Sequence, residues 1–189
     1  YRLKSSVLAI VSKDSLEKTL DHDGYIILKR TCFYSESGGQ VSDTGMIVGK
    51  NFKARVVDVF KGPNGQHVHK IKLLDGKITV NDEVEVIIDK QRRKEIEANH
   101  SSVHILQYCL QQVVDKNIRQ AGSYVDEFKL RFDFTCPSKI SDEEIVKTEE
   151  MVNNIIKKGV ITSTEGMPLD KAKELGAMAL FGEKYSDTV

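Results

Sequence analysis

Two histidines, His100 and His104, are the residues of this sequence whose spacing most directly suggests chemistry. They lie four positions apart in a stretch with helical periodicity. At about 100° per residue their rings project about 40° apart from one face, roughly one turn from each other. Two imidazoles placed in this way can bind one zinc ion, although the same spacing occurs in helices with one core-bonded and one solvated histidine. Ser101 follows His100, so the general-base glutamate of the His-Glu-x-x-His metalloproteases is absent.

A zinc site needs a third ligand and usually a fourth. Cys109 lies about 140° around the helix from the second histidine and points away from the pair. Cys32 and Cys136 could approach only through tertiary structure, and His67 and His69 are interpreted as solvated strand residues. The residues alone therefore assign no third ligand.

Residues 31–45 form a segment dense in glycine and polar side chains. Glycines let a backbone approach a ligand closely. Gln40 and Asp43 carry side-chain donors and acceptors in this segment, and Thr31 carries a hydroxyl. The alternative is an elaborate turn whose polar groups satisfy its own backbone. The Gly-x-x-x-x-Gly-Lys-Ser/Thr pattern is absent, so the segment is not a phosphate-binding loop of that kind.

The elements that must position these residues change type near residue 90. Before it, short β-rich or alternating runs joined by tight turns predict a small antiparallel barrel. The expected strands are 7–11, 25–28, 46–48, 52–60, 66–74 and 84–88, with a Gly-Pro-Asn-Gly turn at 62–65.

After residue 90 the apolar residues follow a helical period, which predicts a helix over 91–114. Ser141 and Glu144 form a capping box for a second helix, which should end at Gly159. Strands are expected at 129–134 and 160–164, and a short helix at 168–175. We expect an α+β protein with two subdomains packed on each other: a glycine-rich antiparallel β-barrel over 1–90, and an α+β subdomain carrying the histidine helix over 91–189.

Composition excludes several classes of protein. The chain has 189 residues, 40% of them hydrophobic, and 28 basic residues balance 28 acidic ones. A protein bound to phosphates only by non-specific attraction would be basic overall. No apolar run approaches the roughly 18–20 residues of a membrane span, so no membrane partner is expected. Three scattered cysteines fit a reducing, cytoplasmic setting. The chain lacks an initiator methionine, and we expect a piece of a longer protein.

Four stretches of the chain resemble the editing domain of alanyl-tRNA synthetase, and they occur in that family's order. The stretch 99–106, Asn-His-Ser-Ser-Val-His-Ile-Leu, is similar to the family's H-T-A-T-H-L-L; the others are 31–45, 122–134 and 179–185. The resemblance implies a glycine-rich barrel packed on an α+β editing subdomain. It also implies an aminoacyl-tRNA deacylase that removes serine or glycine from the tRNA for alanine.

For the metal, the resemblance implies a zinc ion bound by His100 and His104. The family's other two ligands are the Cys and His of a C-G-G-T-H motif, expected beyond Val189. Because two histidines hold zinc poorly without further ligands, we expect weak or absent zinc in this chain alone.

For catalysis, the resemblance assigns Gln40 and Asp43 to the site and implicates Thr31 in choosing serine over alanine. Val103 stands where the family usually has threonine, which removes one hydroxyl near the metal. A hydrolytic second site is a known remedy where a binding pocket separates such similar amino acids poorly. Either water activation or substrate positioning could be the role of the zinc.

The expected partners are the acceptor end of the tRNA for alanine and the remaining domains of the synthetase. Lys90, Arg92, Arg93 and Lys94 cluster before the histidine pair and are candidate tRNA-binding residues, or else a solvated helix start. The competing interpretation is a non-catalytic tRNA-binding module without the remaining metal ligands. A metalloenzyme acting on unrelated substrates would leave the glycine-rich segment unexplained.

Overall fold

The computed structural model describes residues 1–13, 15–159, 161, 163, 165–177 and 186–189. Its contacts divide the chain into two compact units, Tyr1–Val152 and Asn153–Val189. The first unit holds every residue singled out above for catalysis, metal binding or tRNA binding. The two units are therefore described separately.

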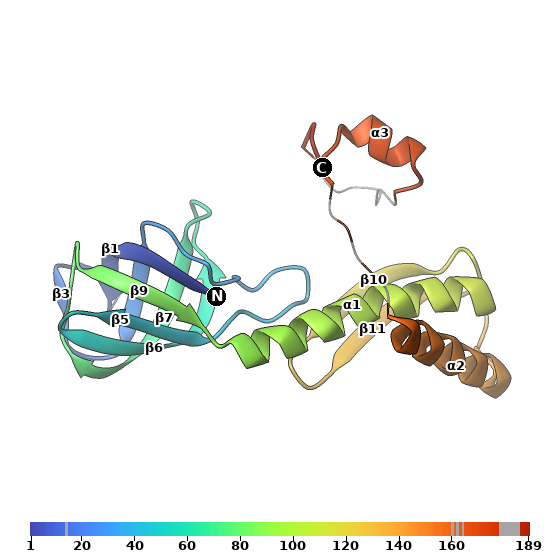
Figure 1. Ribbon diagram of the computed structural model, residues 1–189, viewed down its shortest axis with the longest axis horizontal. Helices are drawn as coiled ribbons and strands as arrows, with labels where there is room; N and C mark the ends of the chain where they lie inside the picture. The colour runs from blue at the N-terminus through green and yellow to red at the C-terminus, as the bar shows by residue number, and fades with distance from the viewer. Residues whose placement is uncertain (14, 160, 162, 164, 178–185) are drawn as a thin grey trace. The chain divides into compact units, whose positions relative to one another are not determined.

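The first unit begins with a closed antiparallel barrel of six strands (Figure 1). Its strand order is β1-β4-β7-β6-β5-β9, and β9 pairs again with β1. The expected α+β class and antiparallel barrel are confirmed, and each of the six expected strands forms. The strands are β1 (Arg2–Ser12), β4 (Gly24–Leu28), β5 (Gly45–Gly49), β6 (Phe52–Lys61), β7 (His67–Gly76) and β9 (Glu83–Ile88).

The long strand β1 closes the barrel because its two halves have different partners. Residues 2–6 pair with β9, and Val7 to Val11 pair with β4. Closure leaves these six strands without a free edge between them. Side chains that alternate inward fill the interior, and those with no exposed surface include Val7, Ile10, Ile26, Ile47, Val56 and Val86. Three short strands lie outside the closed barrel: β2 (Ser15–Glu17) beside β1, and β3 (Thr19–Leu20) paired with β8 (Ile78–Thr79).

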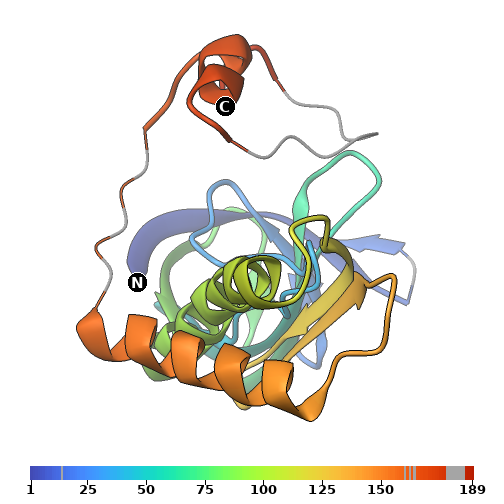
Figure 2. The same cartoon turned by 90° about the vertical axis from the view of Figure 1, so that its right-hand side faces the viewer.

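Helix α1 (Lys90–Val113) follows the last barrel strand directly, close to the predicted bounds. Figure 2 looks nearly along this helix, with the barrel behind it. The Asp89 side chain caps it by accepting a hydrogen bond from the Arg92 backbone N–H. Its apolar stripe buries Ile96 and Val103 against Val125 of the hairpin formed by β10 (Arg119–Val125) and β11 (Leu130–Thr135). The histidine pair therefore lies on a helix held by apolar packing.

Helix α2 (Asp142–Lys158) has the predicted capping box, and it crosses the boundary between the two units. The Glu144 carboxylate accepts from the Ser141 N–H at 2.8 Å, and the Glu144 N–H donates to the Ser141 hydroxyl at 3.3 Å. Gly159, with a φ of 68°, follows its last residue. The expected short helix forms as α3 (Leu169–Glu174) in the second unit. The expected strand at 160–164 and the stretch 179–185 lie on or across positions outside the described residues.

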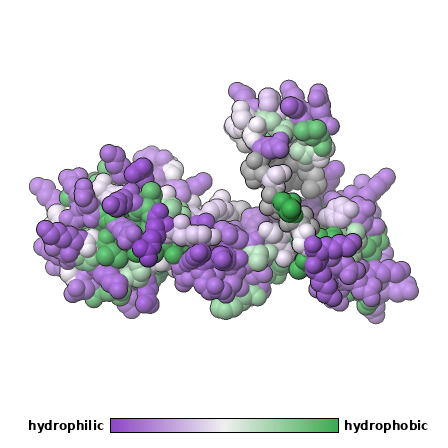
Figure 3. Space-filling view, in the orientation of Figure 1, coloured by the Kyte–Doolittle hydropathy of each residue, from purple (hydrophilic) through white to green (hydrophobic). Residues whose placement is uncertain are grey.

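Hydrophilic side chains cover most of the visible surface of the barrel (Figure 3). Among the described residues, no helix is long and apolar enough to cross a membrane. The domain boundary expected at 90/91 stays a prediction. The last barrel strand ends at Ile88, and α1 begins at Lys90.

Candidate functional site

The rings of His100 and His104 face each other on α1, with centroids 5.4 Å apart and planes inclined by 35°. Two imidazoles bound to one tetrahedral zinc ion at about 2.0–2.1 Å have ring centres roughly 5 Å apart. The pair therefore fits a shared metal ion. Burial, and after it the neighbouring His104, lowers the pKa of His100. A lowered pKa favours the neutral ring, which is the form that binds metals.

The glycine-rich segment reaches this histidine pair through Gln40. The Gln40 side-chain oxygen lies 2.7 Å from His100 Nδ1, although the two residues are 60 positions apart. Gln40 is buried, with 8% of its surface exposed. Its backbone is held by reciprocal hydrogen bonds with Ser37, at 3.0 and 3.2 Å. The glycine-rich segment and the histidine pair, which the sequence singles out independently, are therefore in contact through Gln40 and His100.

Backbone hydrogen bonds fasten the same segment to strand β10. The Val125 N–H donates to the Gly39 carbonyl at 2.8 Å, and the Val41 N–H donates to the Val125 carbonyl at 3.0 Å. Gly39 has a φ of 81°, and a Cβ at this position would lie 2.2 Å from the Ser123 carbonyl oxygen. Only glycine fits here without a shift of the backbone. This close approach explains one of the glycines and positions Gln40.

Asp43 is buried and holds an ion pair with Arg93 of α1. Its carboxylate accepts from the Arg93 Nε–H at 2.7 Å, from the Arg93 Nη2, and from the Tyr34 backbone N–H at 2.6 Å. The hydrogen bond to Asp43 raises the pKa of Arg93. Asp43 therefore fixes the glycine-rich segment to the first turn of α1 through this ion pair. A catalytic role for Asp43 stays a prediction.

Arg92 makes a second connection between α1 and its neighbours. It donates to the Glu127 carboxylate at 2.8 Å and to the Ser42 carbonyl at 2.7 Å. The hydrogen bond from Arg92 lowers the pKa of Glu127. Lys90 and Lys94 are exposed. The tRNA-binding role predicted for these basic residues is untested, and both arginines have protein acceptors.

Thr31 lies in a different hydrogen-bond network, which links the glycine-rich segment to His69 of strand β7. Its hydroxyl is 2.9 Å from His69 Nε2 and accepts from the Phe33 N–H at 3.1 Å. The other ring nitrogen, His69 Nδ1, is 3.1 Å from the Ile26 carbonyl. Because this carbonyl can only accept, Nδ1 carries the hydrogen, and Nε2 accepts the Thr31 hydroxyl proton.

His69 has no exposed surface, so its interpretation as a solvated strand residue is wrong. Burial lowers its pKa to about 4, and the ring is neutral at physiological pH. The alternation in β7 is broken there, because Val68 and His69 are both buried. An alternating strand pattern does not predict that two consecutive residues are both buried. For this reason the sequence did not identify His69 as the residue that orients the Thr31 hydroxyl.

The structure does not bring Thr31 into hydrogen-bond contact with the Gln40–His100 pair. Thr31 lines a hollow of about 360 Å³ together with Lys61 and His67, whereas neither Gln40 nor His100 lines it. Gln40 is therefore bonded to His100, Asp43 to Arg93 and Thr31 to His69.

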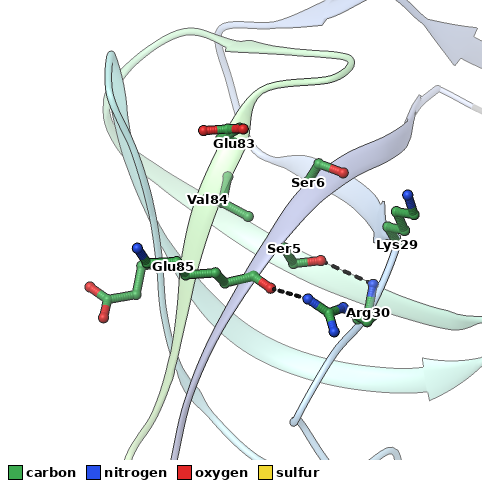
Figure 4. Close-up of a pocket in the computed structure, with 8 residues that line it drawn as sticks. Ser5, Ser6, Lys29, Arg30, Glu83, Val84 and Glu85 are labelled. Atoms are coloured by element: carbon green, nitrogen blue, oxygen red, sulfur yellow. Dashed lines mark hydrogen bonds between the residues drawn. The ribbon is translucent and has the colours of Figure 1, made fainter.

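A hollow of about 670 Å³ lies on the barrel wall beside β1 and β9 (Figure 4). Its lining includes Lys4 and Arg30, and also the carboxylates Glu83 and Glu85. Charges of both signs line it. Neither the glycine-rich segment nor α1 contributes a residue, so it gives no argument for chemistry.

The sequence of this chain is similar to those of known tRNA synthetases. A family model described as tRNA synthetases class II (A) matches residues 1–92. The alanine-tRNA ligase of Halalkalibacterium halodurans is 47% identical over 164 residues, which are 87% of this chain and 19% of that protein. That of Listeria monocytogenes is 42% identical over 187 residues, 98% of this chain and 21% of that protein. The Crocosphaera subtropica enzyme is 45% identical over 164 residues, 87% of this chain and 18% of its own length.

The chain belongs to the alanine-tRNA ligase family. It spans about a fifth of the length of the curated relatives it matches. The matching family model covers the barrel and the first residues of α1. The matches to whole alanine-tRNA ligases extend beyond it, over the histidine pair and the β10–β11 hairpin.

In the part of the chain that the structure describes, the histidine pair supplies two candidate metal ligands. Across the described ranges, no group of three or more His, Cys, Asp or Glu side chains could hold a metal ion. Cys109 is buried on α1. His100 and His104 fit zinc as two of its ligands, and the zinc site stays a prediction.

Proposed function

We propose that this segment removes wrongly attached serine or glycine from the tRNA for alanine, by zinc-dependent hydrolysis of the aminoacyl ester. The observation that carries the proposal is the 2.7 Å contact between Gln40 and His100. It places a segment of glycines and polar side chains against a pair of metal-type ligands, in a chain of the alanine-tRNA ligase family. Such a second hydrolytic site supplies discrimination that one binding pocket cannot.

In the proposed reaction a water oxygen adds to the ester carbonyl carbon. The carbon–oxygen bond to the ribose then breaks, the ribose oxygen takes one proton from the attacking water, and the amino acid leaves with the water's oxygen. The Gln40 oxygen is used by His100, whereas its amide nitrogen donates no hydrogen bond within the described part of the chain. That N–H group is available to the substrate's carbonyl or hydroxyl oxygen. Zinc bound by His100 and His104 would supply a Lewis acid or fix the substrate's position.

Selection of serine over alanine is proposed to use the hydroxyl group of Thr31. The Thr31 oxygen donates to His69 and accepts from Phe33, which leaves one lone pair. That lone pair could accept the hydroxyl hydrogen of serine, which alanine lacks. Because Thr31 is outside the Gln40–His100 contact, the amino-acid side chain would have to extend toward the barrel.

The proposed partners are the acceptor end of the tRNA and the other domains of the synthetase. Exposed ammonium groups at Lys90 and Lys94 can approach phosphates directly. Arg92 and Arg93 are held by carboxylates, so reversing their charge would also disturb the fold. The two lysines therefore give the cleaner test of tRNA binding. Their replacement by alanine should weaken binding and flatten its salt dependence.

The proposal is tested by serine release from seryl-tRNA(Ala), with this chain and with a longer form carrying the two further ligands. The zinc-loaded longer form should hydrolyse the ester. Replacing His104, an exposed residue, should lower the rate by about 100-fold or more. His22→Ala is the matched control, because His22 is also an exposed histidine and lies in the loop between β3 and β4. An inactive longer form with bound zinc would contradict editing.

The second candidate function is tRNA binding without catalysis. The observation that favours it is the presence of only two metal-type ligands near the site among the described residues. In that case both forms bind the tRNA, and neither releases serine above the uncatalysed rate. Hydrolysis by the longer form alone would support editing and make this chain an incomplete site.

A further inference from the structure

We propose that Gln40 is a positioning residue that fixes the tautomer of His100, with hydrogen on Nδ1 and a free lone pair on Nε2. The inference deepens the proposed function and rests on it for the identity of the metal. In this role Gln40 acts on His100 before any substrate binds. The tautomer of His100 can therefore be measured without following a reaction.

The tautomer follows from the chemistry of the contact. The Gln40 side-chain oxygen can only accept, so at 2.7 Å the hydrogen must be on His100 Nδ1. A neutral imidazole carries one N–H hydrogen, and therefore Nε2 keeps its lone pair. Histidines that bind metals are commonly oriented in this way, by donating the other ring N–H to an oxygen of the protein.

The acceptor is held rigidly before a metal ion arrives. Gln40 is 8% exposed, and its backbone bonds to Ser37 in both directions. On its two sides, Gly39 and Val41 are hydrogen-bonded to Val125 of β10. A preorganised partner costs no further ordering when the ligand binds. The oxygen is thus a fixed reference for the orientation of the His100 ring.

The two histidines differ in how they are held. His100 is half-buried and bonded to Gln40, whereas His104 is exposed and makes no hydrogen bond to any residue that the structure describes. His100 should therefore be ordered in the metal-free protein, with His104 joining when the ion binds. Removing the Gln40 oxygen should weaken metal binding through His100 while leaving the number of ligands unchanged.

The test uses the 189-residue chain, labelled with ¹⁵N and free of metal, at a pH where its histidines are neutral. Long-range ¹H–¹⁵N correlation spectra identify which ring nitrogen of His100 carries the hydrogen. A titration of Zn²⁺ alone into the longer form, which carries the two further ligands, then gives the affinity, because the 189-residue chain is expected to bind zinc weakly or not at all. The variants are Gln40→Leu, which removes the oxygen, and Gln40→Glu, which keeps an acceptor. Gln111→Leu is the matched control, because Gln111 is a half-buried glutamine of α1 that bonds to the Ile118 carbonyl.

The expected wild-type spectrum shows His100 with hydrogen on Nδ1. Gln40→Leu should give a mixture of tautomers and lower the Zn²⁺ affinity by about 10- to 100-fold. Gln40→Glu should retain the Nδ1–H form, and Gln111→Leu should leave the His100 signals unchanged. Hydrogen on Nε2 in the wild-type protein, or an unchanged His100 in Gln40→Leu, overturns the proposal. Failure of the proposed function would appear separately, as absent deacylation by the longer form with the tautomer result intact.

Discussion

The ion pair between Asp43 and Arg93 predicts a large loss of stability when one partner is removed. The Asp43 side chain is 2% exposed and that of Arg93 is 20% exposed. Removing one member of a buried pair costs about 3–5 kcal/mol, because the other charge remains buried without its partner. Since Arg93 keeps some contact with solvent, Asp43→Asn should cost about 3 kcal/mol, the lower end of that range. Domains of ordinary size have unfolding free energies of about 5–15 kcal/mol, so this is a substantial share.

The assay is a double-mutant cycle measured by urea unfolding. Asp43→Asn, Arg93→Met and the double variant should give a coupling energy of about 2 kcal/mol. The exposed pair Arg131 and Asp133, with side chains 68% and 46% exposed, is the matched control and should couple by less than about 1 kcal/mol. A coupling energy between Asp43 and Arg93 no larger than in this control would refute the claim that their ion pair holds the glycine-rich segment against α1.

Three further predictions concern single residues. Between pH 6.5 and pH 4, His69 becomes protonated in the unfolded protein, whereas the buried ring in the folded protein, with a pKa of about 4, stays neutral. The free energy of unfolding should therefore fall by up to about 3 kcal/mol as the pH drops through this range. In urea unfolding measured at several pH values, His69→Gln should show a weaker dependence on pH. Gly39→Ala should destabilise by about 1–3 kcal/mol more than Gly65→Ala, since both have positive φ but only at Gly39 would a Cβ meet the Ser123 carbonyl; equal losses would contradict this explanation. Ser141→Ala should cost about 1 kcal/mol and speed amide hydrogen exchange in the first turn of α2, and unchanged exchange would argue against the cap.

Much of the fold is accessible from the sequence because local patterns and tertiary packing agree. The six barrel strands follow from alternating or β-rich runs separated by turns, and α1 follows from one apolar stripe. Strand β10 (Arg119–Val125) was missed because its residues are mostly polar or small and only Val125 is buried. It forms a hairpin with the neighbouring strand β11 and also bonds to the glycine-rich segment, which is distant in the sequence.

The candidate site is accessible only in part. The spacing of His100 and His104 places both rings on one helical face, since that geometry is local. The Gln40–His100 contact depends on how the glycine-rich segment meets α1, and no local pattern contains it. For the same reason the sequence could not show that Arg93 is held by Asp43. Burial of His69 was missed because a break in strand alternation is visible only once the barrel closes.

Editing by this segment is tested most directly by the rates at which the zinc-loaded longer form releases amino acid from seryl-tRNA(Ala) and alanyl-tRNA(Ala). We expect serine to be released much faster than alanine, and we expect His100→Ala to abolish the release. Equal rates for the two esters would contradict selective editing. Full serine release without His100 would contradict the assignment of the histidine pair and Gln40 to one hydrolytic site.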